Sequence, residues 1–223
     1  MKLPITKRLI TISEMINKTD ILCDIGCDHG YLPISLLLEN KINFAYCCDV
    51  NDGPLVAARK NFEKFSLSDK CEFRKGDGFK AVSDSKFDAV TICGMGGRLI
   101  SRILEDQKSI LSENHQIILQ PMTEAHILRE YLIKNNFSIE KEKISKEDRR
   151  FYNIIEVRYK KEQALPVSDI YTGAGLIDKT NPYLTQYLEK QHKKFTKMVY
   201  LKDGHEDTNL LLSVINELEK LLK

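Results

Sequence analysis

Short apolar runs and stretches of helical periodicity alternate along the first 160 residues of the chain. The apolar runs have the length of a buried β-strand, and we expect strands at residues 21–26, 44–50, 71–77, 87–94 and 115–122. Apolar residues that recur every three to four positions predict helices over residues 31–40, 53–65, from about 98, and 124–136. This alternation is typical of an α/β fold with a parallel sheet and crossover helices.

Two further segments complete the expected sheet and cover it. Apolar residues recur at helical spacing within residues 5–17, so we expect a leading helix that packs on the sheet. Residues 137–160 show two strand-like patterns that meet near Asp148 without a helix between them, which predicts an antiparallel hairpin. The predicted fold is a Rossmann-like, seven-stranded and mostly parallel sheet.

The composition changes after Lys160, where segments containing Pro and Gly indicate a connector. We therefore expect a first domain over residues 1–162 and a second over residues 163–223. In the second domain, two helical stretches are separated by a turn at residues 202–205. One face of the last stretch is apolar and predicts an antiparallel, coiled-coil-like helical hairpin, with a seam formed by Leu211, Val214 or Ile215, Leu218 and Leu222.

The composition is that of a globular protein, with 42% hydrophobic residues, 30% charged residues and a net charge of +2. This nearly balanced charge does not by itself indicate a nucleic-acid partner. No apolar run approaches the roughly 18 residues of a membrane span. The first residues lack the pattern of a signal peptide, so we expect a cytoplasmic protein without membrane association. The six cysteines form no C-x-x-C pair, and we expect no metal site.

The segment that follows the first predicted strand combines acids with glycines. Asp24 ends the strand, and Gly26, Asp28 and Gly30 lie in the turn before the next helix. Glycines let a ligand approach the main chain closely, whereas two carboxylates would repel a pyrophosphate. They suit S-adenosylmethionine, whose sulfonium and amino groups are positive and whose carboxylate can accept hydrogen bonds from N–H groups of the turn. The alternative is that both acids only cap turns.

Acids also end the next two predicted strands. Asp49 lies where an acid binds the ribose hydroxyls in Rossmann-like folds, and Asp77 can accept a hydrogen bond from the amino group of an adenine. Each residue alone is equally well explained as a turn-forming Asp. Together with Asp24, they predict one nucleoside that lies across the carboxyl edge of the sheet.

The fourth predicted strand ends in a glycine-rich turn formed by Cys93, Gly94, Met95, Gly96 and Gly97. Three glycines leave room where methyl donor and acceptor should meet, although a tight turn alone explains one or two of them. A catalytic thiolate at Cys93 is not expected, because no His or Lys adjoins it and transfer from a sulfonium needs no such nucleophile. The chain also lacks the Asp/Asn-Pro-Pro-aromatic run of exocyclic-amine methyltransferases and the Pro-Cys of cytosine carbon-5 enzymes.

Several of these motifs resemble one known family. The matching segments are KRLITISEMI, DIGCDHGYLP, CCDVNDGPL, KGDGF, ICGMGG, LQPM, GAGLI and NPYLTQYLEKQHKKF. They are similar to those of the bacterial tRNA (adenine-22-N1)-methyltransferases, over nearly the whole chain. The resemblance implies a class I methyltransferase domain, a coiled-coil-like C-terminal domain, S-adenosylmethionine as cofactor and methylation of adenine N1 in the D-arm of tRNA.

The resemblance also assigns roles to individual residues. The cofactor positions that it implies are Asp24, Gly26, Asp28, Asp49, Asp77, Gly78 and Gly94, to which we add Gly30, Val50 and Cys93. Attack by adenine N1 uses an in-plane lone pair and requires positioning more than a general base. Because the product ring is cationic, we expect Asp28, with His29 beside it, to stabilise the developing charge. A hydrogen-bonding role at the helix start explains His29 equally well.

The target base must be extruded to reach the cofactor, because N1 is hidden in a stacked or paired adenine. The residues expected to line its pocket are Tyr31, Met95, Gly96, Gln120, Pro121 and Met122, although helix packing explains Tyr31 equally well. The basic residues expected to contact tRNA phosphates are Arg149, Arg150, Lys190, Lys193, Lys194 and Lys197. A solvated helix face explains the lysines equally well.

Two other functions share these features. A small-molecule methyltransferase would bind the same cofactor, and a non-catalytic RNA-binding protein could retain the fold without using it. The complete series of acids argues against the second. We expect a tRNA methyltransferase that acts as a monomer or weak oligomer.

Overall fold

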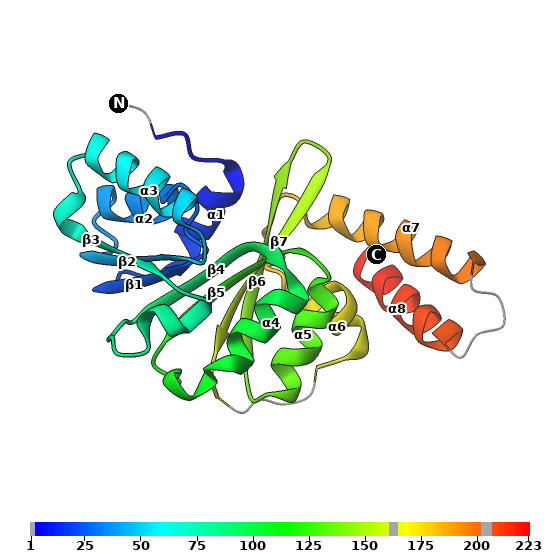
Figure 1. Ribbon diagram of the computed structural model, residues 1–223. Coiled ribbons are helices and arrows are strands. Elements are labelled where there is room, and N and C mark those ends of the chain that lie inside the picture. Colours follow the sequence, from blue (N-terminus) through cyan, green and yellow to red (C-terminus); the bar gives the residue numbers. More distant parts are fainter. Residues whose placement is uncertain (1–2, 161–164, 202–206) are drawn as a thin grey trace.

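The computed structural model describes residues 3–160, 165–201 and 207–223. Its centre is a seven-stranded sheet in the order β3-β2-β1-β4-β5-β7-β6 (Figure 1). The strands are β1 (Ile21–Ile25), β2 (Phe44–Asp49), β3 (Cys71–Lys75), β4 (Ala89–Gly96), β5 (Gln116–Thr123), β6 (Ser138–Glu147) and β7 (Arg150–Arg158). β1 to β5 are parallel, whereas β7 is antiparallel to both β5 and β6. The predicted fold class and the closing hairpin are therefore confirmed.

Helices cover both faces of the sheet, and each face has its own hydrophobic core. The helices on one face are α1 (Lys7–Met15), α2 (Tyr31–Leu38) and α3 (Asp52–Lys64). Those on the other face are α4 (Gly97–Asp106) and α5 (Ala125–Lys134). Successive strand residues alternate between the two cores, as Leu22 and Cys23 of β1 do. Burial on both faces explains why the parallel strands are continuous apolar runs in the sequence.

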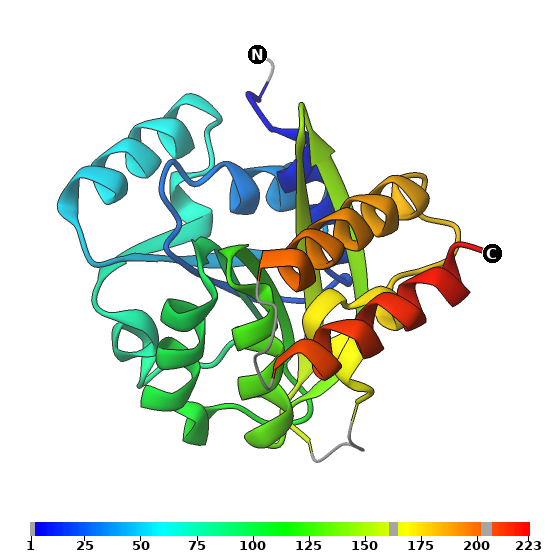
Figure 2. The ribbon, with the colours of Figure 1, turned by 90° about the vertical axis from the view of Figure 1, so that its right-hand side faces the viewer.

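The chain continues from the sheet into three more helices, α6 (Val167–Thr172), α7 (Leu184–Leu201) and α8 (Asp207–Leu221). α7 and α8 lie side by side next to the β6–β7 hairpin (Figures 1 and 2). Leu211, Val214 and Leu218 of α8 are buried in a third core, which confirms the predicted helical pair. Leu222, which was also predicted for the seam, is exposed and lies just after the end of α8. The expected turn at residues 202–205 and the domain boundary at residues 162–163 lie outside the described residues.

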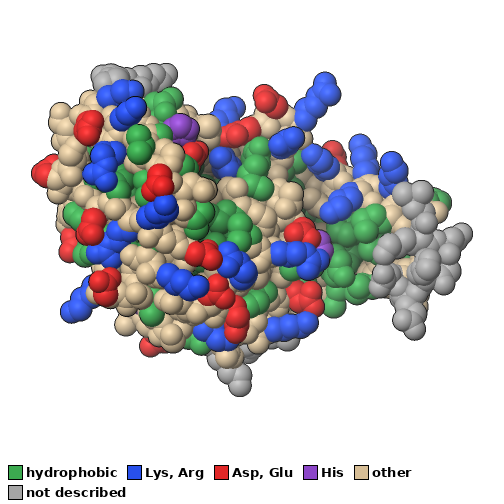
Figure 3. All heavy atoms as spheres, in the orientation of Figure 1, with side chains coloured by type: hydrophobic (Ala, Val, Ile, Leu, Met, Phe, Trp, Pro, Cys, Tyr) green, Lys and Arg blue, Asp and Glu red, His purple; other side chains and the backbone are tan. Residues whose placement is uncertain are grey.

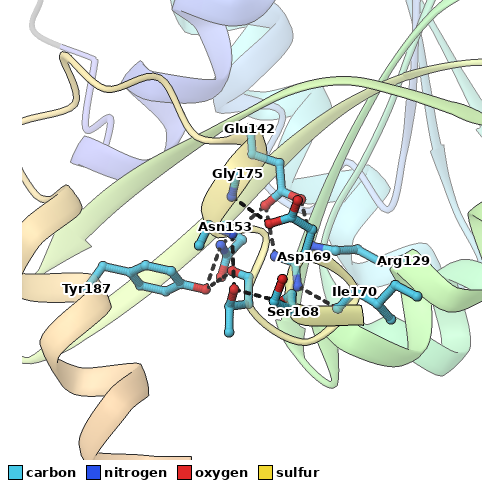
Figure 4. Close-up of polar contacts among 10 residues, drawn as sticks. Arg129, Glu142, Asn153, Ser168, Asp169, Ile170, Gly175 and Tyr187 are labelled. Carbon is cyan, nitrogen blue, oxygen red and sulfur yellow. Dashed lines mark hydrogen bonds and ion pairs between the residues drawn. The ribbon is translucent and has the colours of Figure 1, made fainter. Parts of the chain in front are cut away.

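Within the described residues, the short connections contain the 3-10 helices η1 (Ser68–Lys70), η2 (Gly78–Val82), η3 (Lys108–Ile110) and η4 (Ala174–Leu176). The last of these belongs to the joint between the sheet and the helical pair, where Ala174 packs in the same core as Ile144 of β6 and Tyr187 of α7. Polar contacts cross this joint as well (Figure 4). The Tyr187 hydroxyl donates to the main-chain carbonyl of Thr172 at 2.5 Å, and Asn153 of β7 donates to the same hydroxyl at 3.2 Å. Apolar and polar contacts together fix the helical pair against the sheet.

Candidate active site

A cavity of about 400 Å³ lies at the carboxyl ends of β1, β2 and β4. Residues at or just after these strand ends form most of its wall, together with side chains from α1, α2, α3 and β5. The lining residues are Arg8, Leu9, Asp24, Gly26, Cys27, Asp28, His29, Tyr31, Leu32, Asp49, Asn51, Pro54, Cys93, Gly94, Met95 and Met122. Asp24, Asp28 and Asp49, which were predicted from two separate segments, thus share one cavity.

Asp24 is the most buried acid of this cavity, with 4% of the residue exposed. Burial raises the pKa of its carboxyl to about 6, and the charges of Asp49 and Asp28 shift the pKa in the same direction. The Thr91 hydroxyl donates a 2.6 Å hydrogen bond to Asp24 Oδ1 and offsets part of this shift. Asp24 is therefore mostly ionised at neutral pH, and its poorly solvated charge favours a cationic ligand.

The turn between β1 and α2 uses several of its main-chain N–H groups within the protein. Gly26 and Gly30 have φ angles of 77° and 69°, in the left-handed region that glycine adopts without strain. The N–H groups of Gly26 and Cys27 both donate to the carbonyl of Cys48, at 2.8 and 3.0 Å, and Gly30 N–H donates to the carbonyl of Cys27. Three donors that the sequence suggested for a ligand carboxylate are therefore already used within the protein.

Asp28, His29 and Tyr31 form a group on the cavity wall, in which Asp28 and His29 are exposed and Tyr31 is half-buried. Asp28 has a φ of 49°, and its side chain is 73% exposed. His29 Nε2 lies 3.7 Å from Asp28 Oδ1, and the His29 ring stacks on Tyr31 with centroids 5.5 Å apart. Asn61 of α3 donates to the main-chain carbonyl of His29 at 2.9 Å and anchors the turn. The residues predicted for charge stabilisation and base binding are thus neighbours.

The end of β2 contributes Asp49 and two further residues. Asp49 Oδ1 accepts a 2.9 Å hydrogen bond from the N–H of Asn51, so the carboxylate has a fixed orientation. Asn51 and Pro54 also line the cavity, although the sequence did not single them out. Val50, which was predicted to contact the cofactor, is 50% exposed and is not part of the lining.

Asp77 lies outside the cavity lining, as does Gly78. Both carboxylate oxygens of Asp77 accept hydrogen bonds from the guanidinium of Arg102 on α4, each at 3.0 Å. These bonds and the positive charge of Arg102 hold the pKa of Asp77 below its usual range. Asp77 is therefore ionised and oriented, but it is separated from the group formed by the other acids.

The end of β4 places Cys93, Gly94 and Met95 on the cavity wall, whereas Gly96 is not part of it. Burial raises the pKa of the Cys93 thiol far above its ordinary value, so this thiol is protonated at neutral pH. A catalytic thiolate is accordingly disfavoured. All six cysteines are free.

The end of β5 differs in part from the sequence prediction. Met122 lines the cavity, but Gln120 and Pro121 are buried and do not. Gln120 Oε1 accepts hydrogen bonds from the N–H of Gly94 at 3.2 Å and from Arg8 Nη1 at 2.7 Å. Gln120 therefore supports the cavity wall instead of touching what the cavity binds.

A second group of predicted residues lies on the β6–β7 hairpin and on α7. Figure 3 shows Lys and Arg side chains gathered over this part of the surface. A groove of about 390 Å³ is lined by Lys146, Asp148, Arg149, Phe151, Gln186, Glu189, Lys190 and Lys193. Lys190 Nζ donates to the main-chain carbonyl of Arg149 at 2.9 Å and joins the hairpin to the helix. The other predicted cations are Arg150, Lys194 and Lys197. All three are exposed, and each lies within four residues of a groove residue in the sequence.

Features of other protein classes are absent from the part of the chain that the structure describes. Within residues 3–160, 165–201 and 207–223, no helix is long and apolar enough to cross a membrane. The same residues contain no group of three or more His, Cys, Asp or Glu side chains placed to hold a metal ion.

Comparison with known proteins shows the family of the chain. The chain matches the family described as TrmK, tRNA (adenine(22)-N(1))-methyltransferase, over residues 22–220. The tRNA (adenine(22)-N(1))-methyltransferase of Bacillus subtilis is 34% identical over 206 residues, which cover 89% of this chain and 85% of that protein.

Solved structures agree with this result. TrmK of M. capricolum, in complex with the cofactor product S-adenosyl-homocysteine, is 30% identical, with a TM-score of 0.80 and coverage of 98% of this chain and 97% of that one. The crystal structure of the B. subtilis tRNA methyltransferase TrmK is 28% identical, with a TM-score of 0.79 and coverage of 99% and 97%.

Proposed function

Because this chain belongs to the tRNA (adenine(22)-N(1))-methyltransferase family, we propose that its cavity holds S-adenosylmethionine beside the target adenine. The chain is an enzyme that transfers a methyl group from S-adenosylmethionine to N1 of adenine 22 in tRNA. The observation that carries the assignment of the site is that Asp24, Asp28, Asp49 and Gly94 line one cavity at the carboxyl edge of the sheet.

The chemistry of the lining residues fits this cofactor. Asp49, held by the N–H of Asn51, is placed to accept hydrogen bonds from the two ribose hydroxyls. Asp24 offers a buried negative charge to the cationic groups of the methionyl part. Gly94 keeps the end of β4 free of a side chain, so the two substrates can approach each other there. When bound, S-adenosylmethionine supplies an electrophilic methyl group.

The residues around the target adenine act by positioning and by charge. N1 attacks with its in-plane lone pair, so no residue has to remove a proton first. The flat surface formed by the stacked His29 and Tyr31 rings is suited to receive an extruded base. The Asp28 carboxylate, exposed beside these rings, stabilises the positive charge that develops on the adenine ring. Met95 and Met122 close the apolar side of the base pocket.

The groove between the β6–β7 hairpin and α7 is the proposed contact surface for the tRNA backbone. The cations that line it are Lys146, Arg149, Lys190 and Lys193. The other cations of the proposed surface are Arg150, Lys194 and Lys197, which are exposed on β7 and α7. Phosphate contacts of this kind add affinity and fix the register of the RNA without reading its sequence. A tRNA substrate agrees with a cytoplasmic location. We also propose a monomer or weak oligomer, because the apolar seam of α8 is buried within its own chain.

The assignment is tested with purified protein, methyl-labelled S-adenosylmethionine and two tRNA transcripts that differ at nucleotide 22. We expect label in the transcript with adenine at that position and none above background in the transcript with guanine. Reverse transcription should stop at the modified base, because methylation of N1 blocks base pairing. Equal labelling of both transcripts, or labelling of a metabolite extract but not of tRNA, would contradict the proposal and favour another substrate.

A further inference from the structure

Arg8 brings a permanent positive charge into a cavity that otherwise carries acids. Among the described lining residues it is the one Arg, and none is Lys. S-adenosylmethionine has two cationic groups, two ribose hydroxyls and a single anion, the α-carboxylate of its methionyl part. The acids of the cavity match the cations and the hydroxyls. The carboxylate has no counterpart of permanent opposite charge in the lining except Arg8.

Contacts from three strands hold the Arg8 side chain and its helix. Arg8 Nη1 donates to Gln120 Oε1 at 2.7 Å and to Met122 Sδ at 3.2 Å, both on β5. The ring of Tyr152 on β7 lies 5.4 Å from Arg8 Cζ. The main-chain N–H of Arg8 donates to Glu147 Oε1 on β6 at 2.8 Å and fixes the start of α1. The guanidinium is therefore preorganised, which lowers the entropic cost of binding an anion.

One donor of this guanidinium lacks a partner. Arg8 Nε is buried and makes no hydrogen bond to any residue that the structure describes. A buried, unsatisfied donor on a charged group is costly, so the protein alone does not satisfy the hydrogen-bonding capacity of this guanidinium. A carboxylate matches the geometry of a guanidinium and forms charge-assisted hydrogen bonds with it.

The main-chain N–H groups of the turn after β1 are not all available to bind the carboxylate in place of Arg8. The N–H groups of Gly26, Cys27 and Gly30 already donate to carbonyl oxygens within the protein. Arg8 is also close to the end of β4, because a Cβ built on Gly94 would lie 3.7 Å from Arg8 Nη1. If the methyl group of the cofactor faces the acceptor at the end of β4, the methionyl part ends close to this guanidinium.

We propose that Arg8 binds the α-carboxylate of S-adenosylmethionine and so fixes the methionyl end of the cofactor. This inference rests on the proposed function of the cavity. A phosphate of the target nucleotide is the competing anion. The carboxylate is favoured because Arg8 is anchored by the fully buried Gln120 beneath the cavity wall, whereas tRNA phosphates remain at the surface.

The test compares two ligands that differ only in the methionyl part. S-adenosylhomocysteine carries the carboxylate, and 5′-methylthioadenosine lacks the whole amino-acid portion. We expect Arg8→Met to weaken S-adenosylhomocysteine binding about 10- to 100-fold, as for loss of a charged hydrogen bond. The affinity for 5′-methylthioadenosine should change less than about twofold. Arg8→Lys, which keeps the charge but loses the planar fork, should give an intermediate affinity for S-adenosylhomocysteine.

Lys7→Met is the matched control, since Lys7 is exposed on the same helix and does not line the cavity. It should bind both ligands like the original chain. Equal weakening of both ligands by Arg8→Met would overturn the proposal and indicate a general disturbance of the cavity. An unchanged affinity for S-adenosylhomocysteine with a raised KM for tRNA would also overturn it and assign Arg8 to a phosphate. If the unaltered chain bound neither ligand, the proposed function itself would fail.

Discussion

Arg129 on α5 and Glu142 on β6 form an ion pair in which both side chains are almost completely buried. Nε of Arg129 lies 2.6 Å from Oε1 of Glu142, and Nη2 lies 2.8 Å from Oε2 (Figure 4). Arg129 Nη1 also donates to the main-chain carbonyl of Ile170 on α6 at 3.2 Å. Gly173 leaves the space for this pair, because a Cβ there would lie 2.6 Å from both side chains. The pair therefore connects the sheet, α5 and the segment that leads to α7.

Removing one partner of this pair should be strongly destabilising. We expect Arg129→Met to lower the free energy of unfolding by about 3 to 5 kcal/mol, because it leaves the Glu142 carboxylate buried without its cation. Urea denaturation of the purified protein measures this change. The exposed pair of Lys134 and Glu130 on the same helix provides the control, and Lys134→Met should cost less than about 1 kcal/mol. If both variants lost a similar free energy of unfolding, burial would not explain how much the Arg129 pair contributes to stability.

Asp24 should destabilise the ligand-free protein at neutral pH. Its pKa in the folded state is about 6, above its ordinary value of 3.8, so the folded state holds more protons between these two pH values. Stability therefore falls as pH rises through this window, by about 3 kcal/mol in total. We expect Asp24→Asn to raise the free energy of unfolding at pH 7.5 and to have little effect near pH 4. Urea titrations at the two pH values check this difference.

The same substitution should damage cofactor binding. Asp24→Asn removes the buried charge that faces a cationic ligand, so its affinity for S-adenosylhomocysteine should fall at pH 7.5 even as its stability rises. In the unaltered protein, affinity should also fall as pH drops below about 6, because protonation neutralises Asp24. A variant that is both less stable and unimpaired in binding would refute this account.

The sheet and most of its acids were predictable because their signals are local. Parallel strands buried on both faces are continuous apolar runs, and an acid at the end of each run lies at the same edge of the sheet. This reasoning placed Asp24 and Asp49 in one cavity. It failed for Gln120, because a polar residue in a strand can support the wall from beneath as well as line it. It also missed Arg8, whose contact with Gln120 joins residues 112 positions apart and leaves no local pattern.

The lysines of α7 should contribute to tRNA binding and not to cofactor binding. Lys193 and Lys194 are exposed on the helix that borders the hairpin groove. We expect Lys193→Glu with Lys194→Glu to raise the Kd for tRNA about tenfold or more and to reduce the salt dependence of binding. Fluorescence anisotropy with labelled tRNA at several salt concentrations measures both effects. Binding of S-adenosylhomocysteine should be unchanged.

A matched charge reversal on the opposite side of the molecule tests the specificity of this effect. Lys60 and Lys64 are exposed on α3, far from α7 (Figure 1). Lys60→Glu with Lys64→Glu alters the net charge by the same amount, so it controls for long-range electrostatics. If both double variants weakened tRNA binding equally, the result would contradict the proposal that the groove contacts tRNA.

Substitution of Asp77 tests whether the adenine of the cofactor extends beyond the residues that line the cavity. Its carboxylate is oriented by Arg102, yet each oxygen retains a lone pair that can accept a hydrogen bond from the adenine amino group. We expect Asp77→Ala to weaken S-adenosylhomocysteine binding about tenfold but to leave the affinity for S-inosylhomocysteine, which has no amino group there, nearly unchanged. Asp106→Ala, which removes the other acid near Arg102, should affect neither ligand. Calorimetry with both ligands measures these affinities, and equal weakening of the two by Asp77→Ala would restrict Asp77 to a structural role.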